Sequence, residues 1–140
     1  MKKLLIINGP NLNLLGIRET ELYGEKSLAD IITDLRQTFI GFTIDEIQSN
    51  SETEIVDVLQ HASNNYHGVA INAGAFTHTS VSIRDAVAAI NIPVVELHIT
   101  NTSARELFRA TSLISPVCKG TINGFGYFSY HLAVYSLINL

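Results

Sequence analysis

The chain has 140 residues, 46% of them hydrophobic, and a formal net charge of −4. This length predicts one domain over residues 1–140, and the acidic balance gives no basic stripe, so we expect no nucleic-acid partner. Because no apolar run approaches the roughly 18–20 residues that span a bilayer, and because the one cysteine excludes an internal disulfide, we expect a cytoplasmic protein without a membrane partner.

The first half of the chain alternates strand and helix patterns. A continuous apolar run over residues 3–8 predicts a strand covered on both faces. The polar loop that follows, residues 8–24, is too long for a tight turn and is typical of functional loops. We then expect a helix between Ser27 and Gly41, a strand at Thr43–Gln48, and a helix from the capping pair Ser51 and Glu54 to Asn64–Asn65.

The second half continues the alternation. We expect a strand at 68–72, a helix capped by Thr79 or Ser80, a strand at 94–98, a short helix at 103–110, a strand within 114–123 and a last helix after Gly126. The pattern predicts an α/β fold: a flavodoxin-like three-layer α/β/α sandwich with a five-stranded parallel sheet in the order 2-1-3-4-5. In such sheets ligands bind beyond the carboxyl ends of the strands, and these ends are polar here.

The long loop and two strand ends bring a cation, a phenol and two imidazoles toward one crevice: Arg18, Tyr23, His78 and His98. A phenol has an ordinary pKa of ~10, and lowering it toward 7 takes roughly 4 kcal/mol of stabilisation of the anion. Arg18 lies five residues from Tyr23 and could supply much of it. The simpler alternative is a tyrosine ring packed under the loop beside a solvated arginine.

Glu96 and His98 point to the same face of their strand, so the carboxylate can fix the imidazole tautomer, which suits a general acid. A structural histidine is the alternative for His98, and a neighbour of the helix cap is the alternative for His78. Arg105 and Arg109 share a face of the short helix and could bind hydroxyls or an acidic ligand, or be solvated.

The sequence does not match two other protein classes with this fold, nor the common phosphate-binding motifs. A response-regulator receiver needs an acidic cluster after the first strand, where this chain has Asn8 and Asn11. A flavodoxin needs a phosphate loop there, but leucines fill much of residues 12–15, and the Walker A and GxGxxG motifs are absent. His78 and His98 lack acidic or cysteine ligands at the spacing of a usual metal site, so we expect no metal.

Over essentially its whole length the chain resembles the type II 3-dehydroquinate dehydratases. The resemblance rests on the separated stretches 7–16, Arg18 with Tyr23–Gly24, 48–50, 71–75, 77–80, 84–86, 96–98 and 115–126. It implies a homo-oligomer, a dodecamer of four trimers, that dehydrates 3-dehydroquinate to 3-dehydroshikimate in the shikimate pathway without a cofactor, by stepwise anti elimination through an enolate. The alternative is a flavodoxin-like small-molecule binding protein without this chemistry.

The resemblance also implies roles for individual residues. Tyr23 is the base that takes a proton from C2, Arg18 favours its phenolate, Asn11 helps hold a water at the enolate oxygen, and His98 protonates the departing C1 hydroxyl with Glu96 behind it. The implied substrate-binding groups are the side chains of Asn72, His78 and Arg109, the amides of Ile99 and Thr100, and Asp85 from an adjacent subunit. The chain departs from the family pattern at Ile17, Thr20, Ser51, Thr53, Ser103 and Leu107, none of which has an implied chemical role.

Overall fold

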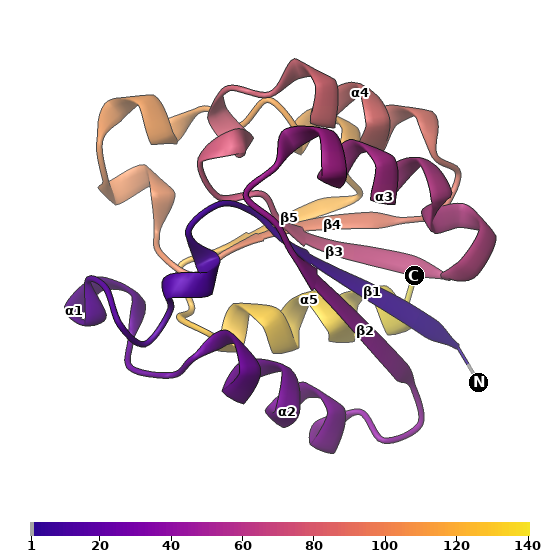
Figure 1. The fold of residues 1–140 in the computed structure, drawn as a ribbon, viewed down its shortest axis with the longest axis horizontal. Helices are drawn as coiled ribbons and strands as arrows, with labels where there is room; N and C mark the ends of the chain where they lie inside the picture. The colour runs from indigo at the N-terminus through magenta and orange to yellow at the C-terminus, as the bar shows by residue number, and fades with distance from the viewer. Residues whose placement is uncertain (1) are drawn as a thin grey trace.

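A computed structural model describes residues 2–140. Its centre is a five-stranded sheet in the order β2-β1-β3-β4-β5, and every neighbouring pair is parallel (Figure 1). The strands are β1 (Lys3–Asn8), β2 (Thr43–Gln48), β3 (Gly68–Asn72), β4 (Val94–His98) and β5 (Gly120–Asn123). The predicted flavodoxin-like order and all five predicted strands are therefore confirmed.

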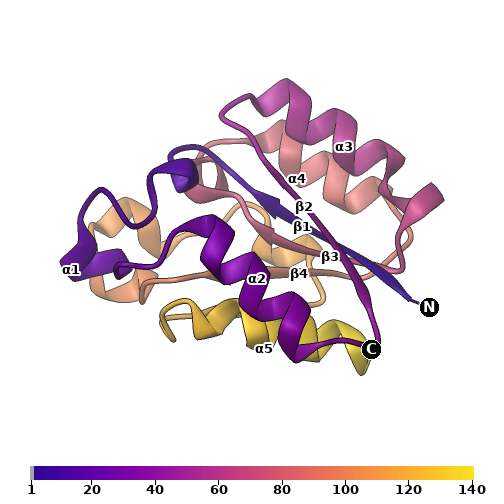
Figure 2. The ribbon, with the colours of Figure 1, turned by 60° about the horizontal axis from the view of Figure 1, so that its bottom comes forward.

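Helices cover both faces of the sheet. These are α2 (Leu28–Thr38) and α5 (Phe128–Ile138) on one face, and α3 (Glu52–Asn65) and α4 (Val81–Ala89) on the other (Figures 1 and 2). Leu4 and Ile6 of β1 belong to the core beneath α2 and α5, whereas Leu5 and Ile7 belong to the core beneath α3 and α4. Side chains alternate between the faces of a strand, so a strand buried on both faces has the continuous apolar run seen in the sequence.

Serine caps fix the starts of three helices near the carboxyl ends of the strands. Ser27 and Asp30 form the reciprocal capping box of α2. Ser51 Oγ accepts a hydrogen bond from the Glu54 amide at 3.2 Å. Ser80, rather than Thr79, caps α4, because its Oγ accepts from the Ile83 amide at 3.0 Å. These local bonds set where each chain segment turns back from the sheet edge.

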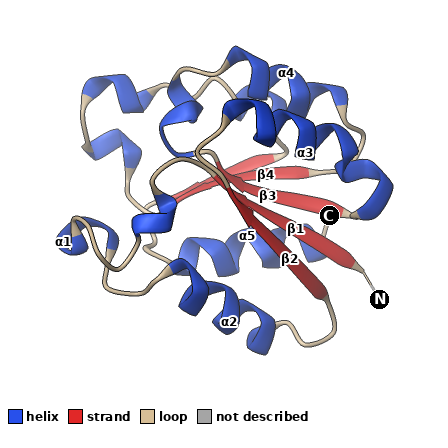
Figure 3. Cartoon of the chain, viewed as in Figure 1, coloured by secondary structure: helices blue, strands red, loops and turns tan. Residues whose placement is uncertain are grey.

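The predicted short helix at 103–110 is wrong. Residues Thr102–Ala104 and Leu107–Ala110 form two short 3-10 turns, and Arg105 between them is extended (Figure 3). Leu107 is 89% exposed and Phe108 is 62% exposed. The segment thus has no apolar stripe buried against the core, which is the main source of stability for an α-helix in a protein.

Candidate functional site

A pocket lies where the sheet topology predicts one, beyond the carboxyl ends of β1, β3 and β4. The loop after β1, the turn after β3 and the segment after β4 form its walls. Of the residues expected at the site, those that line the pocket are Asn11, Arg18, Tyr23, Asn72, His78, His98, Ile99, Thr100 and Arg109. Glu96 lies behind His98, whereas Asp85 is on α4, exposed and ion-paired to Arg84 at 2.9 Å.

The loop that carries Tyr23 is anchored to β3 at its start. The Gly9 amide donates to the Asn72 carbonyl at 2.7 Å, and a Cβ on Gly9 would lie 2.3 Å from the Ala73 carbonyl oxygen. Only glycine allows these two segments of the backbone to approach this closely. Next to it, the Asn11 amide donates to Asn50 Oδ1 at 3.0 Å, and Asn11 itself adopts a left-handed conformation with φ of 69°. Asn11, held by these contacts, lies in the wall of the pocket.

Two guanidinium groups contact Tyr23, which ends the one-turn helix α1 (Thr20–Tyr23). Arg105 Nη1 donates to the Tyr23 hydroxyl at 2.8 Å, and its guanidinium carbon is 5.3 Å from the ring centroid. The guanidinium carbon of Arg18 is 5.0 Å from the same centroid, and its Nη2 pairs with Glu19 at 3.0 Å. The cation expected beside Tyr23 is present, but the hydrogen bond to the phenol comes from Arg105 rather than from Arg18.

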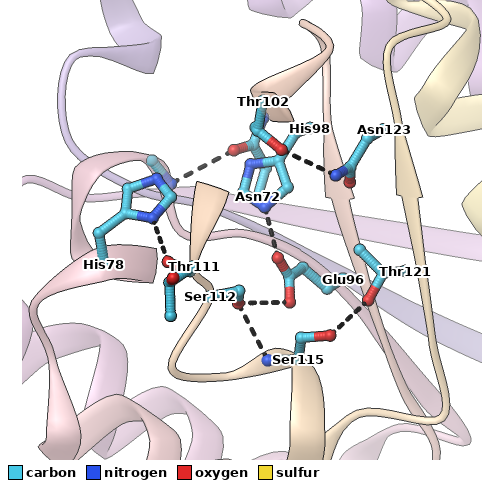
Figure 4. Close-up of polar contacts among 11 residues, drawn as sticks. Asn72, His78, Glu96, His98, Thr102, Thr111, Ser112, Ser115, Thr121 and Asn123 are labelled. Atoms are coloured by element: carbon cyan, nitrogen blue, oxygen red, sulfur yellow. Dashed lines mark hydrogen bonds and ion pairs between the residues drawn. The ribbon is translucent and has the colours of Figure 1, made fainter. Parts of the chain in front are cut away.

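His98 and Glu96 form a buried pair at the end of β4 (Figure 4). His98 Nε2 is 2.5 Å from Glu96 Oε2, and the residues are only 7% and 1% exposed. An ionised carboxylate only accepts hydrogen bonds, so Nε2 carries the hydrogen and Nδ1 is the nitrogen left to exchange a proton with a ligand. The pair therefore has the tautomer and the counter-charge that a general acid needs.

His78 lies beside this pair. Its ring centroid is 6.4 Å from that of His98, with 23° between the ring planes. Its Nδ1 is 2.7 Å from the Thr111 carbonyl oxygen, which can only accept (Figure 4). His78 Nε2 is consequently the nitrogen available to a ligand.

A buried polar chain fixes Asn72 at the floor of the pocket. Asn72 Nδ2 donates to the Tyr130 hydroxyl at 3.1 Å, and its Oδ1 accepts from the Gly74 amide at 3.3 Å. Tyr130 donates in turn to Asn8 Oδ1 at 2.5 Å. Burial raises the pKa of Tyr130, so its phenol stays neutral and remains a donor. Sequence reasoning did not identify this contact between Tyr130 and Asn8, because it joins residues 122 positions apart.

The described residues contain neither a candidate metal cluster nor a candidate membrane span. Between residues 2 and 140, His, Cys, Asp and Glu side chains form no group of three that could hold a metal ion. Within the same range, no helix has both the length and the apolar character needed to cross a membrane.

Comparisons with known proteins agree on one family. The model for "Dehydroquinase class II" matches residues 2–138. A 3-dehydroquinate dehydratase from Rhizobium etli (strain CIAT 652) is 53% identical, over 98% of this chain and 96% of the relative. A 3-dehydroquinate dehydratase from Bacillus cereus (strain G9842) is 48% identical, over 99% of this chain and 96% of the relative. The crystal structure of a type II dehydroquinase from Butyrivibrio crossotus superimposes with a TM-score of 0.95 at 41% identity, covering 98% of this chain and 97% of that one.

Proposed function

The chain belongs to the class II dehydroquinase family, and from this we propose that it is a hydro-lyase that dehydrates 3-dehydroquinate to 3-dehydroshikimate in the shikimate pathway. The observation that carries the proposal is a phenol hydrogen-bonded to a guanidinium in the same pocket as a buried His–Glu pair. A protein that only binds a small molecule has no need for a base, its activator and an acid together. The binding-protein alternative is therefore less well supported.

In the first step Tyr23 takes the proton from C2, beside the substrate ketone. The hydrogen bond from Arg105 and the nearby charge of Arg18 favour the phenolate over the neutral phenol. As the C2–H bond breaks, its electron pair moves toward the ketone oxygen and forms an enolate. We propose that Asn11, which lines the pocket, holds a water at this oxygen. A preorganised donor of this kind is typically worth ~3–4 kcal/mol.

In the second step the enolate collapses and the C1–O bond breaks. The departing hydroxyl takes a proton from Nδ1 of the His98 imidazolium and leaves as water, while a C1–C2 double bond forms. Glu96 stabilises the imidazolium before transfer and keeps the ring oriented afterward. Return of the proton from Tyr23 to His98 through solvent restores the starting state.

The remaining polar groups are proposed to hold the substrate. Asn72, His78 through Nε2, and Arg109 bind ring hydroxyls, and the amides of Ile99 and Thr100, directly after β4, bind the carboxylate. This division leaves Tyr23 and His98 free to act on C2 and C1. No step requires a cofactor.

Asp85 is proposed to act in a neighbouring subunit. It is exposed on α4 and does not line the pocket of its own chain, yet it lies in one of the stretches shared with the family. We propose a cytoplasmic dodecamer of four trimers in which Asp85 enters an adjacent pocket. If the mass measured in solution at the working concentration is that of a monomer, this arrangement is contradicted.

Tyr23→Phe tests the proposed chemistry. The substitution removes the phenolic oxygen and keeps the ring, so we expect turnover of 3-dehydroquinate to fall by about 10²-fold or more while substrate binding changes little. Turnover is measured by product formation and binding by calorimetry with the same substrate. Near-normal turnover in this variant would rule out Tyr23 as the base.

A further inference from the structure

The two oxygens of Glu96 have different partners. Oε2 is 2.5 Å from His98 Nε2, and Oε1 accepts from Ser112 Oγ at 2.9 Å (Figure 4). Glu96 is 1% exposed, so its side-chain partners rather than bulk water decide how the carboxylate is oriented. Ser112 lies in the segment between the second 3-10 turn after β4 and the turn that precedes β5, outside every stretch that the sequence singled out.

The surroundings of Ser112 determine where its single hydroxyl proton points. Ser112 Oγ accepts from the Ser115 amide at 3.0 Å, so its own proton is free to go to Glu96. An ionised carboxylate cannot donate, which fixes the direction of this bond. Ser115 is held in its turn, because its Oγ lies 3.0 Å from Thr121 Oγ1 on β5. Figure 4 shows these bonds continuing from β5 to the imidazole.

We propose that Ser112 is a positioning residue, which acts through Glu96 to hold His98 in the orientation that proton transfer to the substrate requires. This inference rests on the proposed function. Donation from Ser112 to Oε1 fixes the rotation of the carboxylate, so Oε2 stays directed at Nε2 of His98. Because Nε2 of His98 is bonded to Glu96, Nδ1 is the nitrogen that remains to exchange a proton with the substrate. Ser112 does not line the pocket that contains Tyr23; it lines the adjoining cavity behind His98, and we assign it no contact with the substrate.

The test uses Ser112→Ala with two companions. Ser112→Thr keeps a hydroxyl at the same position and is the rescue variant. Ser136→Ala is the matched control, because Ser136 is also partly buried and its hydroxyl donates to the Leu132 carbonyl within α5, away from the pocket. If Ser112→Ala does not fold, Ser112→Cys replaces it, since a thiol is a weak donor of similar size.

We expect kcat of Ser112→Ala to fall by roughly tenfold to a hundredfold with KM within about twofold, because the acid is misplaced while the binding groups are intact. Ser112→Thr should recover most of the rate, and Ser136→Ala should match the unsubstituted protein. A purely structural role would not change the environment of one imidazole proton. The downfield proton resonance of the His98 Nε2–H, observed by NMR with labelled histidine, should therefore move in Ser112→Ala and return in Ser112→Thr.

The two proposals fail in distinguishable ways. Absence of product from the unsubstituted folded protein would contradict the proposed function, and the histidine resonance would still report on Ser112. Normal product formation together with an unchanged kcat and an unmoved resonance in Ser112→Ala would overturn the positioning role alone. A raised KM with unchanged kcat would also overturn it, since that result would mean that Ser112 contributes to binding.

Discussion

Tyr23 illustrates what residue patterns can and cannot predict about a site. The loop composition indicated a phenol beside a cation, and two guanidinium groups do lie over its ring. The sequence indicated Arg18 because it is near in the chain, whereas the hydrogen bond comes from Arg105, 82 residues away. Arg105 was noted only as one of a pair on an expected helix. Its direction toward Tyr23 depends on the extended backbone between two 3-10 turns, which no local pattern specified.

Arg105→Ala should lower kcat for 3-dehydroquinate by roughly tenfold to a hundredfold. A charge-assisted hydrogen bond contributes about 1.5–3 kcal/mol, and its loss disfavours the Tyr23 phenolate. Steady-state kinetics measure the effect, and Arg105→Lys is the comparison that keeps the charge without the planar guanidinium. Unchanged kcat in Arg105→Ala would mean that Arg18 alone supports the phenolate.

At the scale of elements, those with strong local signals were predicted, whereas the one-turn helix α1 and the short 3-10 turns were not. A continuous apolar run marked β1, and serine caps with apolar stripes marked α2, α3 and α4. The helix α1 has only four residues, too few to show a period. The segment 103–110 was predicted as a helix, but its large apolar side chains face outward and nothing in the core stabilises a continuous helix there.

The end of α1 offers a test of the loop that delivers Tyr23. Gly24 has φ of 89° and ψ of 175°, a conformation that is essentially restricted to glycine, and a Cβ there would lie 2.6 Å from the Tyr127 ring. We expect Gly24→Ala to lower kcat/KM at least tenfold by displacing Tyr23, with strain of about 1–3 kcal/mol.

Gly41→Ala is the control for this substitution, because a Cβ at that position would meet no described heavy atom within 4 Å beyond its own residue and its two chain neighbours. Kinetics and thermal unfolding of both variants separate loss of the loop conformation from general destabilisation. Equal kcat/KM in the two variants would contradict the proposed role of the loop.

At the scale of the whole molecule, the fold is more predictable than the contacts that complete the site. Strand order follows from alternation and handedness, and this order placed the pocket before any side-chain contact was known. The bonds from Tyr130 to Asn8 and from Ser112 to Glu96 join elements that meet only after the sheet has formed. Such contacts depend on tertiary packing and have no period or motif in the sequence.

The opposite end of the sheet offers a test of pH-dependent stability. The Tyr66 hydroxyl donates to Asp45 at 2.8 Å and Lys3 lies 3.0 Å away, and these contacts hold the pKa of Asp45 below its ordinary value. The carboxylate is stabilised by folding, so its contribution is present above the unfolded pKa of ~3.9 and is lost as the pH falls through the folded pKa.

Asp45→Asn should therefore lower the melting temperature more at pH 7 than at pH 3. The carboxylate is 39% exposed, and solvent screening limits the effect to about 1 kcal/mol or less. Thermal unfolding of both proteins across this pH range measures the difference. An equal loss at both pH values would show that the ionised form of Asp45 does not contribute.

The most direct measurement of the proposed function is incubation of the purified protein with 3-dehydroquinate while the ultraviolet absorbance of the conjugated enone product is followed. We predict a steady rise in absorbance without added metal or cofactor, at a rate proportional to protein concentration. A flat trace from folded protein would contradict the proposed dehydration and favour a small-molecule binding protein that has this pocket without the chemistry.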